Sequence, residues 1–372
     1  MKSEIKKISI FILLLVIALF SGCLKDTSSP AAPGFDYSAE LLTYIELNRN
    51  LNSTSEDSYQ VSVDEVYANM QNYLLIDIRQ YTDFTAGHIE GAINIIPGQI
   101  ISYMKSADII KFHKVIIIGS TGQDGAYVTC LLRLWGLNNV YYLNYGMGYW
   151  NRAFSQEWLE GKGSYPNRNY RGFNYPKNAY SSLPKIDFNP ASANVSQRLE
   201  ERIQLLLEEG FDNIKTTMKE TFDKFFNYGM NKFIDCYMIC DGPEFLYIGA
   251  SGYSGSYGHP GGAVLYEPLT DYKSTSNLQT IPSGRPIVIY SLNGQHSAFI
   301  AAYLRVLGYE AYSINFGSWS LWGSRFISSV MPGLKKRVDY FKNQFTDYGY
   351  WLYDDKGIGV SVVRDYPYVT GE

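Results

Sequence analysis

Uninterrupted apolar runs alternate along this chain with stretches in which apolar residues recur at helical spacing. Residues 115–118 and 287–290 are two such runs, and continuous runs are typical of strands buried on both faces of a parallel sheet. Each run is followed by a glycine-bearing loop and then by a helical pattern. The alternation predicts an α/β fold in which each domain has a parallel β-sheet flanked by helices on both faces.

The pattern occurs twice. The segment Gly122-Gln123-Asp124-Gly125-Ala126 recurs as Gly294-Gln295-His296-Ser297-Ala298, and the offset stays constant through Gly136 and Gly308. Gly87-His88 recurs as Gly258-His259, and Asn144-Tyr145-Gly146 as Asn315-Phe316-Gly317, each with an offset one residue shorter. Further upstream, residues 74–77 pair with residues 246–249 at the offset of the first comparison, that of Gly122 with Gly294. Internal similarity of this kind predicts a tandem duplication.

The repeat and the composition around it divide the chain into six segments. We expect a signal peptide at residues 1–22, a tether at 23–35, a first domain at 36–160, a linker at 161–195, a second domain at 196–330 and a C-terminal tail at 331–372. The tether is too poor in large apolar residues to fold by itself. The tyrosine-rich linker and residues 340–353 are candidate contact surfaces, although packing within the chain explains them equally well.

The N-terminus carries the most specific targeting signal. Lys2, Lys6 and Lys7 precede an apolar core at residues 8–20, and small residues then lead to Cys23. This arrangement resembles a bacterial lipoprotein signal, although Phe20 departs from the aliphatic residue usual at its position. The resemblance implies that Cys23 is lipidated and that the chain lies in the cell envelope, outside the cytoplasm. An uncleaved anchor helix is the alternative, for which the apolar run is short.

Composition excludes several classes of function. The net charge is −4 and no basic stripe is apparent, which argues against nucleic acid as a partner. Apart from Cys23 there are three cysteines, and their spacing fits neither a disulfide scaffold nor a zinc site, so we expect no metal and no cofactor. Cys130 is expected to be a buried structural thiol. Cys236 and Cys240 are expected on one face of a helix, as an intrahelical disulfide or as two inert thiols.

Three motifs of the first unit are Tyr73-Leu74-Leu75-Ile76-Asp77-Ile78-Arg79, Gly87-His88-Ile89-Glu90-Gly91-Ala92-Ile93-Asn94-Ile95 and Tyr142-Leu143-Asn144-Tyr145-Gly146. These motifs resemble the rhodanese-like family, and the presence of two units resembles a tandem sulfurtransferase. In the second unit they are Gly258-His259-Pro260-Gly261-Gly262-Ala263-Val264 and Pro286-Ile287-Val288-Ile289-Tyr290-Ser291. The second match is weaker upstream.

In that family, activity depends on a cysteine that opens the glycine loop and accepts a sulfur atom as a persulfide. The matching positions here are Gly119 and Ser291, and neither can carry a persulfide. The family's loop arginine is replaced by Asp124 and by His296. An acidic Asp124 opposes anion binding at the first loop, whereas the second loop keeps a weakly basic mouth. The candidate anion-binding loop comprises Ser291, Leu292, Asn293, Gly294, Gln295, His296 and Ser297.

Three further residues of the first unit match polar positions of the family. The resemblance implies that Asp77, Arg79 and His88 form a buried structural network near the loop, rather than a catalytic group. In the second unit the aligned Asp-x-Arg pair is replaced by Gly249 and Ser251, inside a glycine-rich segment that we interpret as a flexible surface loop.

Three functions remain as hypotheses. The first is a non-catalytic rhodanese-like lipoprotein, a pseudoenzyme that binds or scaffolds an envelope protein or a small anion. The second is a thiosulfate sulfurtransferase-like enzyme in which another group replaces the cysteine. The third is a serine-based hydrolase using Ser291 and His296, for which the pattern shows no carboxylate that would orient the histidine.

The lipoprotein hypothesis predicts that Cys23→Ala releases the chain from membranes, because the variant has no thiol to receive the lipid. Fractionation of cells into membrane and soluble protein measures this, with Cys130→Ala as the control that should stay membrane-bound. Equal membrane association of the Cys23→Ala variant would instead favour an anchor helix.

Overall fold

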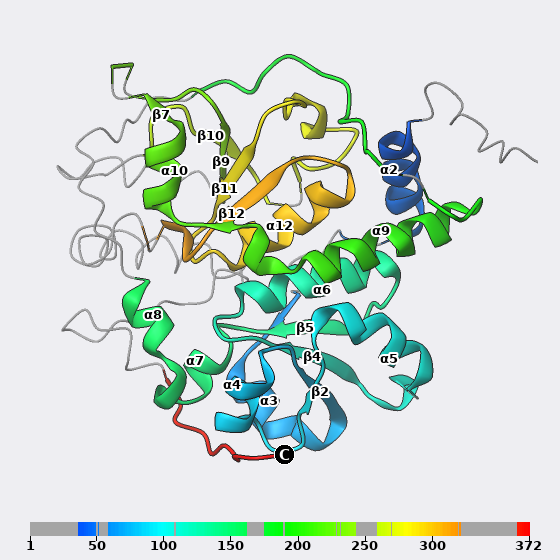
Figure 1. Ribbon diagram of the computed structural model, residues 1–372, viewed down its shortest axis with the longest axis vertical. Helices are drawn as coiled ribbons and strands as arrows, with labels where there is room; N and C mark the ends of the chain where they lie inside the picture. Colours follow the sequence, from blue (N-terminus) through cyan, green and yellow to red (C-terminus); the bar gives the residue numbers. More distant parts are fainter. Residues whose placement is uncertain are drawn as a thin grey trace, which may run out of the picture. The chain divides into compact units, whose positions relative to one another are not determined.

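Two five-stranded parallel β-sheets form the centre of the structure, one in each repeat (Figure 1). The computed structural model describes residues 36–49, 51, 59–107, 109–161, 175–188, 190–227, 229–230, 232–242, 259–268, 270–318, 320 and 363–372. The described residues from Ser38 onwards belong to one compact unit. Within the described ranges, we find no helix with the length and apolarity needed to span a bilayer.

The first sheet has the strand order β1-β5-β4-β2-β3. Its strands are β1 (Gln60–Val61), β2 (Tyr73–Asp77), β3 (Ile93–Asn94), β4 (Lys114–Ile118) and β5 (Val140–Leu143). Its helices are α3 (Val63–Asn69), α4 (Tyr81–Ala86), α5 (Ile100–Ser106), α6 (Gln123–Trp135), α7 (Met147–Trp150) and α8 (Gln156–Glu160). The paired strands all run parallel.

The second sheet repeats this topology. Its strands are β6 (Lys215–Thr216), β9 (Tyr237–Asp241), β10 (Val264–Tyr266), β11 (Ile287–Tyr290) and β12 (Ala311–Ile314), in the order β6-β12-β11-β9-β10. Its helices are α9 (Val195–Glu209), α10 (Met218–Phe225) and α12 (Gln295–Val306), and a short hairpin joins β7 (Phe226–Asn227) to β8 (Lys232–Phe233). In each sheet the first strand of the repeat lies at one edge and the third at the other.

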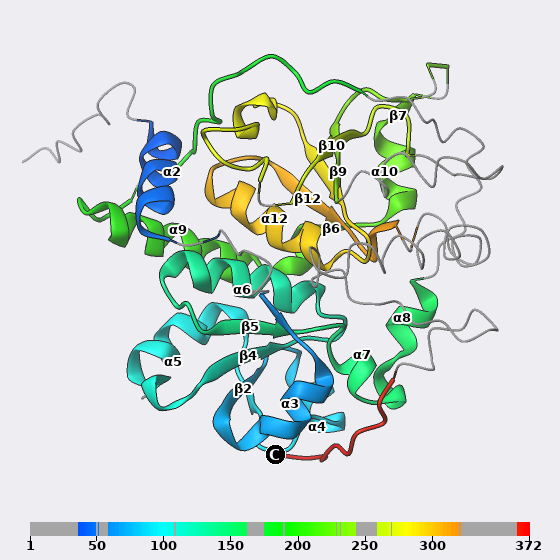
Figure 2. The ribbon, with the colours of Figure 1, turned by 180° about the vertical axis from the view of Figure 1, so that it is seen from behind.

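A single hydrophobic core joins the two repeats. It contains one face of β4, through Val115 and Ile117, and one face of β11, through Ile287 and Ile289. Helices α6, α9 and α12 lie between these faces, and both views show α6 and α12 between the two sheets (Figures 1 and 2). Helix α2 (Tyr37–Asn48) adds residues to the same core from the side. The outer face of each sheet has its own smaller core. The predicted α/β fold with helices on both faces of parallel sheets is confirmed.

Local sequence explains where the central helices begin and end. Helix α6 follows Gly122, at φ 81°, and ends at Gly136, at φ 129°, and both are left-handed conformations that glycine adopts without strain. Helix α9 is capped by Asn194, whose side chain accepts a hydrogen bond from the N–H of Ser196. Its apolar residues recur on one face, which explains why it packs on α6.

Two glutamines link the repeats through a reciprocal exchange of hydrogen bonds. The Gln123 side chain accepts a hydrogen bond from the backbone N–H of Phe316 at 2.8 Å. The Gln295 side chain accepts one from the backbone N–H of Tyr145, also at 2.8 Å. Tyr145 and Phe316 have φ of 63° and 60°, a region that side chains with a Cβ rarely occupy. Each glutamine therefore holds a strained turn of the opposite repeat.

The end of the chain returns to the first repeat. Residues 363–372 run beside α7 and the loop after α4, where His88 and Val369 exchange two backbone hydrogen bonds. The Trp150 indole donates to the carbonyl of Pro367 at 2.8 Å, and the Tyr366 ring stacks on Tyr67 with centroids 3.9 Å apart. An ion pair between Arg152 and Asp365 is a further contact between this segment and the first repeat. This segment covers a surface that the first repeat would otherwise expose.

Two local predictions were wrong. Cys240 lies in β9 and Cys236 directly precedes that strand, so neither is on a helix. The two side chains share a face because a strand repeats every two residues. The pairing of residues 74–77 with 246–249 was also wrong, because the strand that corresponds to β2 is β9. Residues 246–249 themselves lie outside the described residues.

Removing one glutamine should weaken the junction of the repeats. We expect Gln295→Ala to lower the free energy of unfolding by about 1–3 kcal/mol, since it leaves the Tyr145 N–H without its acceptor. Urea denaturation measures the change. Gln156→Ala, which removes an exposed glutamine, is the matched control and should have little effect. A loss no larger than that of the control would contradict the structural role of the exchange.

Candidate functional site

The candidate site is the pair of glycine loops at the carboxyl ends of β4 and β11. The first loop runs from Gly119 to Gly122 and the second from Ser291 to Gly294, and α6 and α12 follow directly. Gly122 and Gly294 have φ of 81° and 85°. A Cβ at Gly294 would lie 2.2 Å from Gln123 Oε1, so the glutamine of the opposite repeat comes too close for any larger residue.

In the first loop, the Asp124 carboxylate occupies the place where a catalytic side chain would stand. Its oxygens accept hydrogen bonds from the backbone N–H of Ser120 at 3.1 Å and of Gly125 at 2.9 Å. A Cβ built on Gly119 would lie 1.9 Å from Asp124 Oδ1. The chain therefore supplies its own carboxyl oxygens to the N–H groups of Ser120 and Gly125.

The environment of this carboxylate is acidic and poorly solvated. Burial raises the pKa of Asp124 despite the two amide hydrogen bonds, and the nearby Asp77 raises it further. Desolvation, and then the charge of Asp124, also raise the pKa of Glu157 on α8. A second anion approaching this loop would find these two amides already occupied.

In the second loop, the Ser291 hydroxyl takes the equivalent central position. Its oxygen accepts hydrogen bonds from the N–H groups of Gly294 at 3.2 Å and Ser297 at 3.1 Å. It donates to the Ser297 hydroxyl, 3.3 Å away, and the residue is only 1% exposed. The amides of the candidate anion-binding loop are thus already engaged by a neutral oxygen of the same loop.

His296 has an orienting carboxylate that the sequence did not reveal. Asp241, at the end of β9, lies against His296 Nδ1 through one oxygen and accepts the Tyr272 hydroxyl through the other at 3.1 Å. The expectation that no carboxylate orients His296 was therefore wrong. Asp241 occupies the same topological place as Asp77 at the end of β2. The sequence pattern that could have predicted this role is the apolar strand Tyr237–Asp241, which ends in an aspartate as β2 does.

Asp77, Arg79 and His88 lie together in the first repeat. The Arg79 guanidinium donates to both oxygens of Asp77, at 3.0 and 2.6 Å, and to the carbonyl of Gly87 at 2.7 Å. The His88 ring bonds the carbonyl of Phe84 and stacks on its ring. All three residues are buried, and the C-terminal segment pairs with His88 above them.

The described thiols are in unreactive surroundings. Cys130, Cys236 and Cys240 are all free and buried. Burial raises the pKa of Cys236 to about 12 and raises those of Cys130 and Cys240 as well. At neutral pH these thiols are therefore protonated and poor nucleophiles.

Several predicted residues cannot be placed. Cys23, Gly249, Ser251 and the segment 340–353 lie outside the described residues. Among the residues that are described, no group of three or more His, Cys, Asp or Glu side chains is arranged to hold a metal ion.

Comparison with known proteins assigns the first repeat to a family. Residues 62–153 match the family model of the rhodanese-like domain. Among solved structures, a rhodanese-related protein from Thermoplasma volcanium is 23% identical over 27% of this chain and 90% of its own, with a TM-score of 0.22. A thiosulfate sulfurtransferase from Pseudomonas aeruginosa is 13% identical over 78% of this chain and 47% of its own, with a TM-score of 0.26.

A third solved structure, an EanB variant in complex with ergothioneine, is 13% identical over 72% of this chain and 69% of its own, with a TM-score of 0.24. Similarities at these identities and TM-scores carry no information about activity. The family model covers β2 to β5 together with the first glycine loop and its aspartate. Residues 62–153 of this chain are therefore a rhodanese-like domain.

Proposed function

We propose that this chain is a tandem rhodanese-like pseudoenzyme, a binding or scaffolding protein that does not transfer sulfur. One observation carries the proposal: the Asp124 carboxylate fills the space at Gly119 in which the family's resemblance places a nucleophilic cysteine. A loop whose amides bind its own carboxylate cannot also stabilise a thiolate or hold a substrate anion.

The shared topology supports a second rhodanese-like domain in the other repeat. Both sheets have the same strand order, and both contain left-handed glycines at equivalent turns, such as Gly91 and Gly262. The Ala92 N–H bonds the Ile89 carbonyl at 3.0 Å, and the Ala263 N–H bonds that of Pro260 at the same distance. Identical local geometry at matched positions is what a duplicated domain would retain.

The enzyme hypotheses lack the groups they need. Sulfur transfer requires an accessible thiolate, and the three described cysteines are buried with raised pKa values. A serine hydrolase requires a base that takes the proton of its nucleophile. The Asp241–His296 pair is suited to that role, but the Ser291 hydroxyl donates to Ser297 rather than to His296.

We further propose that the protein is held at the cell envelope by a lipid on Cys23, outside the cytoplasm. The signal-like sequence of residues 2–23 supports this placement. The partner would be an envelope protein or a small anion. The net charge of −4 speaks against nucleic acid.

The proposal predicts that purified protein forms no thiocyanate from thiosulfate and cyanide above a protein-free blank. Ser291→Cys should accept more sulfur than Gly119→Cys, because a thiol at 291 enters an existing amide cradle whereas one at 119 collides with Asp124. Thiocyanate colorimetry and the gain of one sulfur atom by mass spectrometry measure the two reactions.

Asp124→Asn is the negative control for the two cysteine variants. It should form no more thiocyanate than the protein-free blank, because it adds no thiol. Thiocyanate formation by the unmodified chain, surviving removal of contaminating enzymes, would overturn the proposal.

The raised pKa of Asp124 predicts that this residue lowers the stability of the fold as the pH rises. A carboxyl group whose pKa is higher in the folded than in the unfolded state stabilises the fold below pH 3.8, and that contribution is lost as pH rises through the folded-state pKa. The melting temperature of Asp124→Asn should therefore gain on that of the wild type as the pH rises above the unfolded-state value of 3.8. Asp187→Asn, at an exposed position, is the control. A difference that shrinks with rising pH would contradict the assignment.

A further inference from the structure

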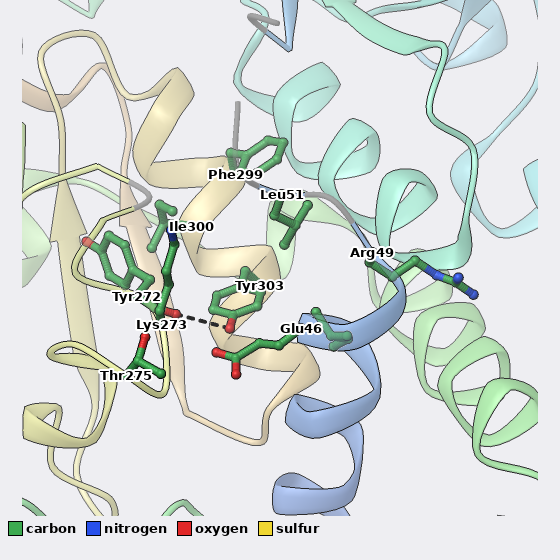
Figure 3. Close-up of a pocket in the computed structure, with 10 residues that line it drawn as sticks. Glu46, Arg49, Leu51, Tyr272, Lys273, Thr275, Phe299, Ile300 and Tyr303 are labelled. Atoms are coloured by element: carbon green, nitrogen blue, oxygen red, sulfur yellow. Dashed lines mark hydrogen bonds between the residues drawn. The ribbon is translucent and has the colours of Figure 1, made fainter. Parts of the chain in front are cut away.

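A separate pocket lies beside α12, on the face that turns towards α2. It has a volume of about 210 Å³. It is lined by Ile45, Glu46, Arg49 and Leu51 from α2 and the residues after it, by Tyr272, Lys273 and Thr275 from the segment after β10, and by Phe299, Ile300 and Tyr303 from α12 (Figure 3). None of these residues belongs to either glycine loop.

The walls of the pocket are aromatic and aliphatic. Tyr272, Phe299, Ile300 and Tyr303 are all buried in the protein. The Tyr303 hydroxyl donates to the backbone carbonyl of Tyr272 at 3.1 Å, which holds the Tyr303 ring against the segment that carries Tyr272 (Figure 3). A volume of this size is below that of pockets for drug-sized molecules and suits a ligand of one ring with one short polar group.

The charged side chains of the pocket are not equivalent. The Arg49 guanidinium points away from the other lining residues and donates to the carbonyl of Leu134 at 2.8 Å (Figure 3). Glu46 accepts hydrogen bonds from the backbone N–H and the hydroxyl of Ser274. Lys273 is half-buried, extends towards Ile300 (Figure 3), and forms no ion pair with any carboxylate in the described part of the chain. It is therefore the cation available to a ligand.

From these features we infer that the pocket binds a small aromatic carboxylate. The ring would pack against Phe299 and Tyr303, and the carboxylate would pair with Lys273 at the end away from Glu46. A lysine held against apolar walls attracts an anion more strongly than one in bulk water, because the local dielectric is lower. A single anionic group beside a ring satisfies both the cation and the apolar walls, whereas a cationic amine would be opposed by Lys273.

The pocket is linked to the second glycine loop through one side chain. The Tyr272 hydroxyl donates to Asp241, which in turn holds His296. Phe299 lies one turn after His296 on α12, and its ring stacks on Tyr59 with centroids 4.6 Å apart. A ligand here would contact the tyrosine that orients the Asp241–His296 pair. The inference does not depend on the absence of sulfur transfer, since neither Gly119 nor Ser291 takes part.

Calorimetric titration of the full chain with benzoate, and separately with benzylamine, tests the inference. We expect benzoate to bind and benzylamine not to bind. Lys273→Met keeps the length of the side chain and removes its charge, so it should weaken benzoate binding by about tenfold or more. Lys185→Met, at an exposed position outside the pocket, is the matched control and should bind benzoate as the wild type does.

Glu46→Gln provides a second variant that does not touch Lys273. It should bind benzoate as well as the wild type or better, because it removes a nearby negative charge. Circular dichroism of each variant confirms that it is folded. Three results would each overturn the inference: no benzoate binding at millimolar concentration, equal binding by Lys273→Met and Lys185→Met, or tighter binding of benzylamine than of benzoate.

Discussion

The reciprocal contact between Gln123 and Gln295 is the interaction on which the arrangement of both loops depends. Each glutamine is the first residue of a central helix, and each accepts the backbone N–H of a left-handed residue in the opposite repeat. Buried amides without an acceptor are costly, so the two turns are stable only when the repeats are joined. The same contact requires Gly122 and Gly294, because any Cβ there would collide with the incoming amide.

This junction has a direct consequence for chemistry. It presents two amide-lined loops of nearly identical backbone shape, yet their contents differ. One loop encloses the Asp124 carboxylate and the other the Ser291 hydroxyl. Backbone amides stabilise any oxygen or sulfur that has the right position, and the side chain that fills the position decides what the loop can do. The same backbone geometry is therefore compatible with different chemical contents in the two loops.

The two repeats also differ in how their polar strand ends are used. In the first, Asp77 forms an ion pair with Arg79, and the C-terminal segment pairs with His88. In the second, Asp241 bonds His296 and Tyr272, which places a partly accessible imidazole between the loop and the aromatic pocket. The second repeat therefore places a polar group, the Tyr272 hydroxyl, beside a cavity. The second repeat is the better place to look for a ligand.

The amino-acid sequence by itself determined the fold class, the central strands and the two glycine loops. Uninterrupted apolar runs such as β4 and β11 can be read directly, because burial on both faces leaves a pattern that needs no knowledge of partners. The absence of a cysteine at Gly119 and Ser291 is likewise a property of single positions. Short apolar stretches do not distinguish a helix from a strand, because residues i and i+4 share a face in both. For this reason the segment that forms β9 was predicted to be a helix.

Only the tertiary structure decided what surrounds these positions. The position of Asp124 at Gly119 depends on the exact direction of one side chain. The contact of Asp241 with His296, and that of residues 363–372 with His88, join segments that are far apart in the chain. Periodicity describes which residues face inward, but it does not say which distant residue they meet there. These contacts depend on the strand order and on how α6 packs against α12. Such packing is a property of the assembled core and not of any local sequence pattern.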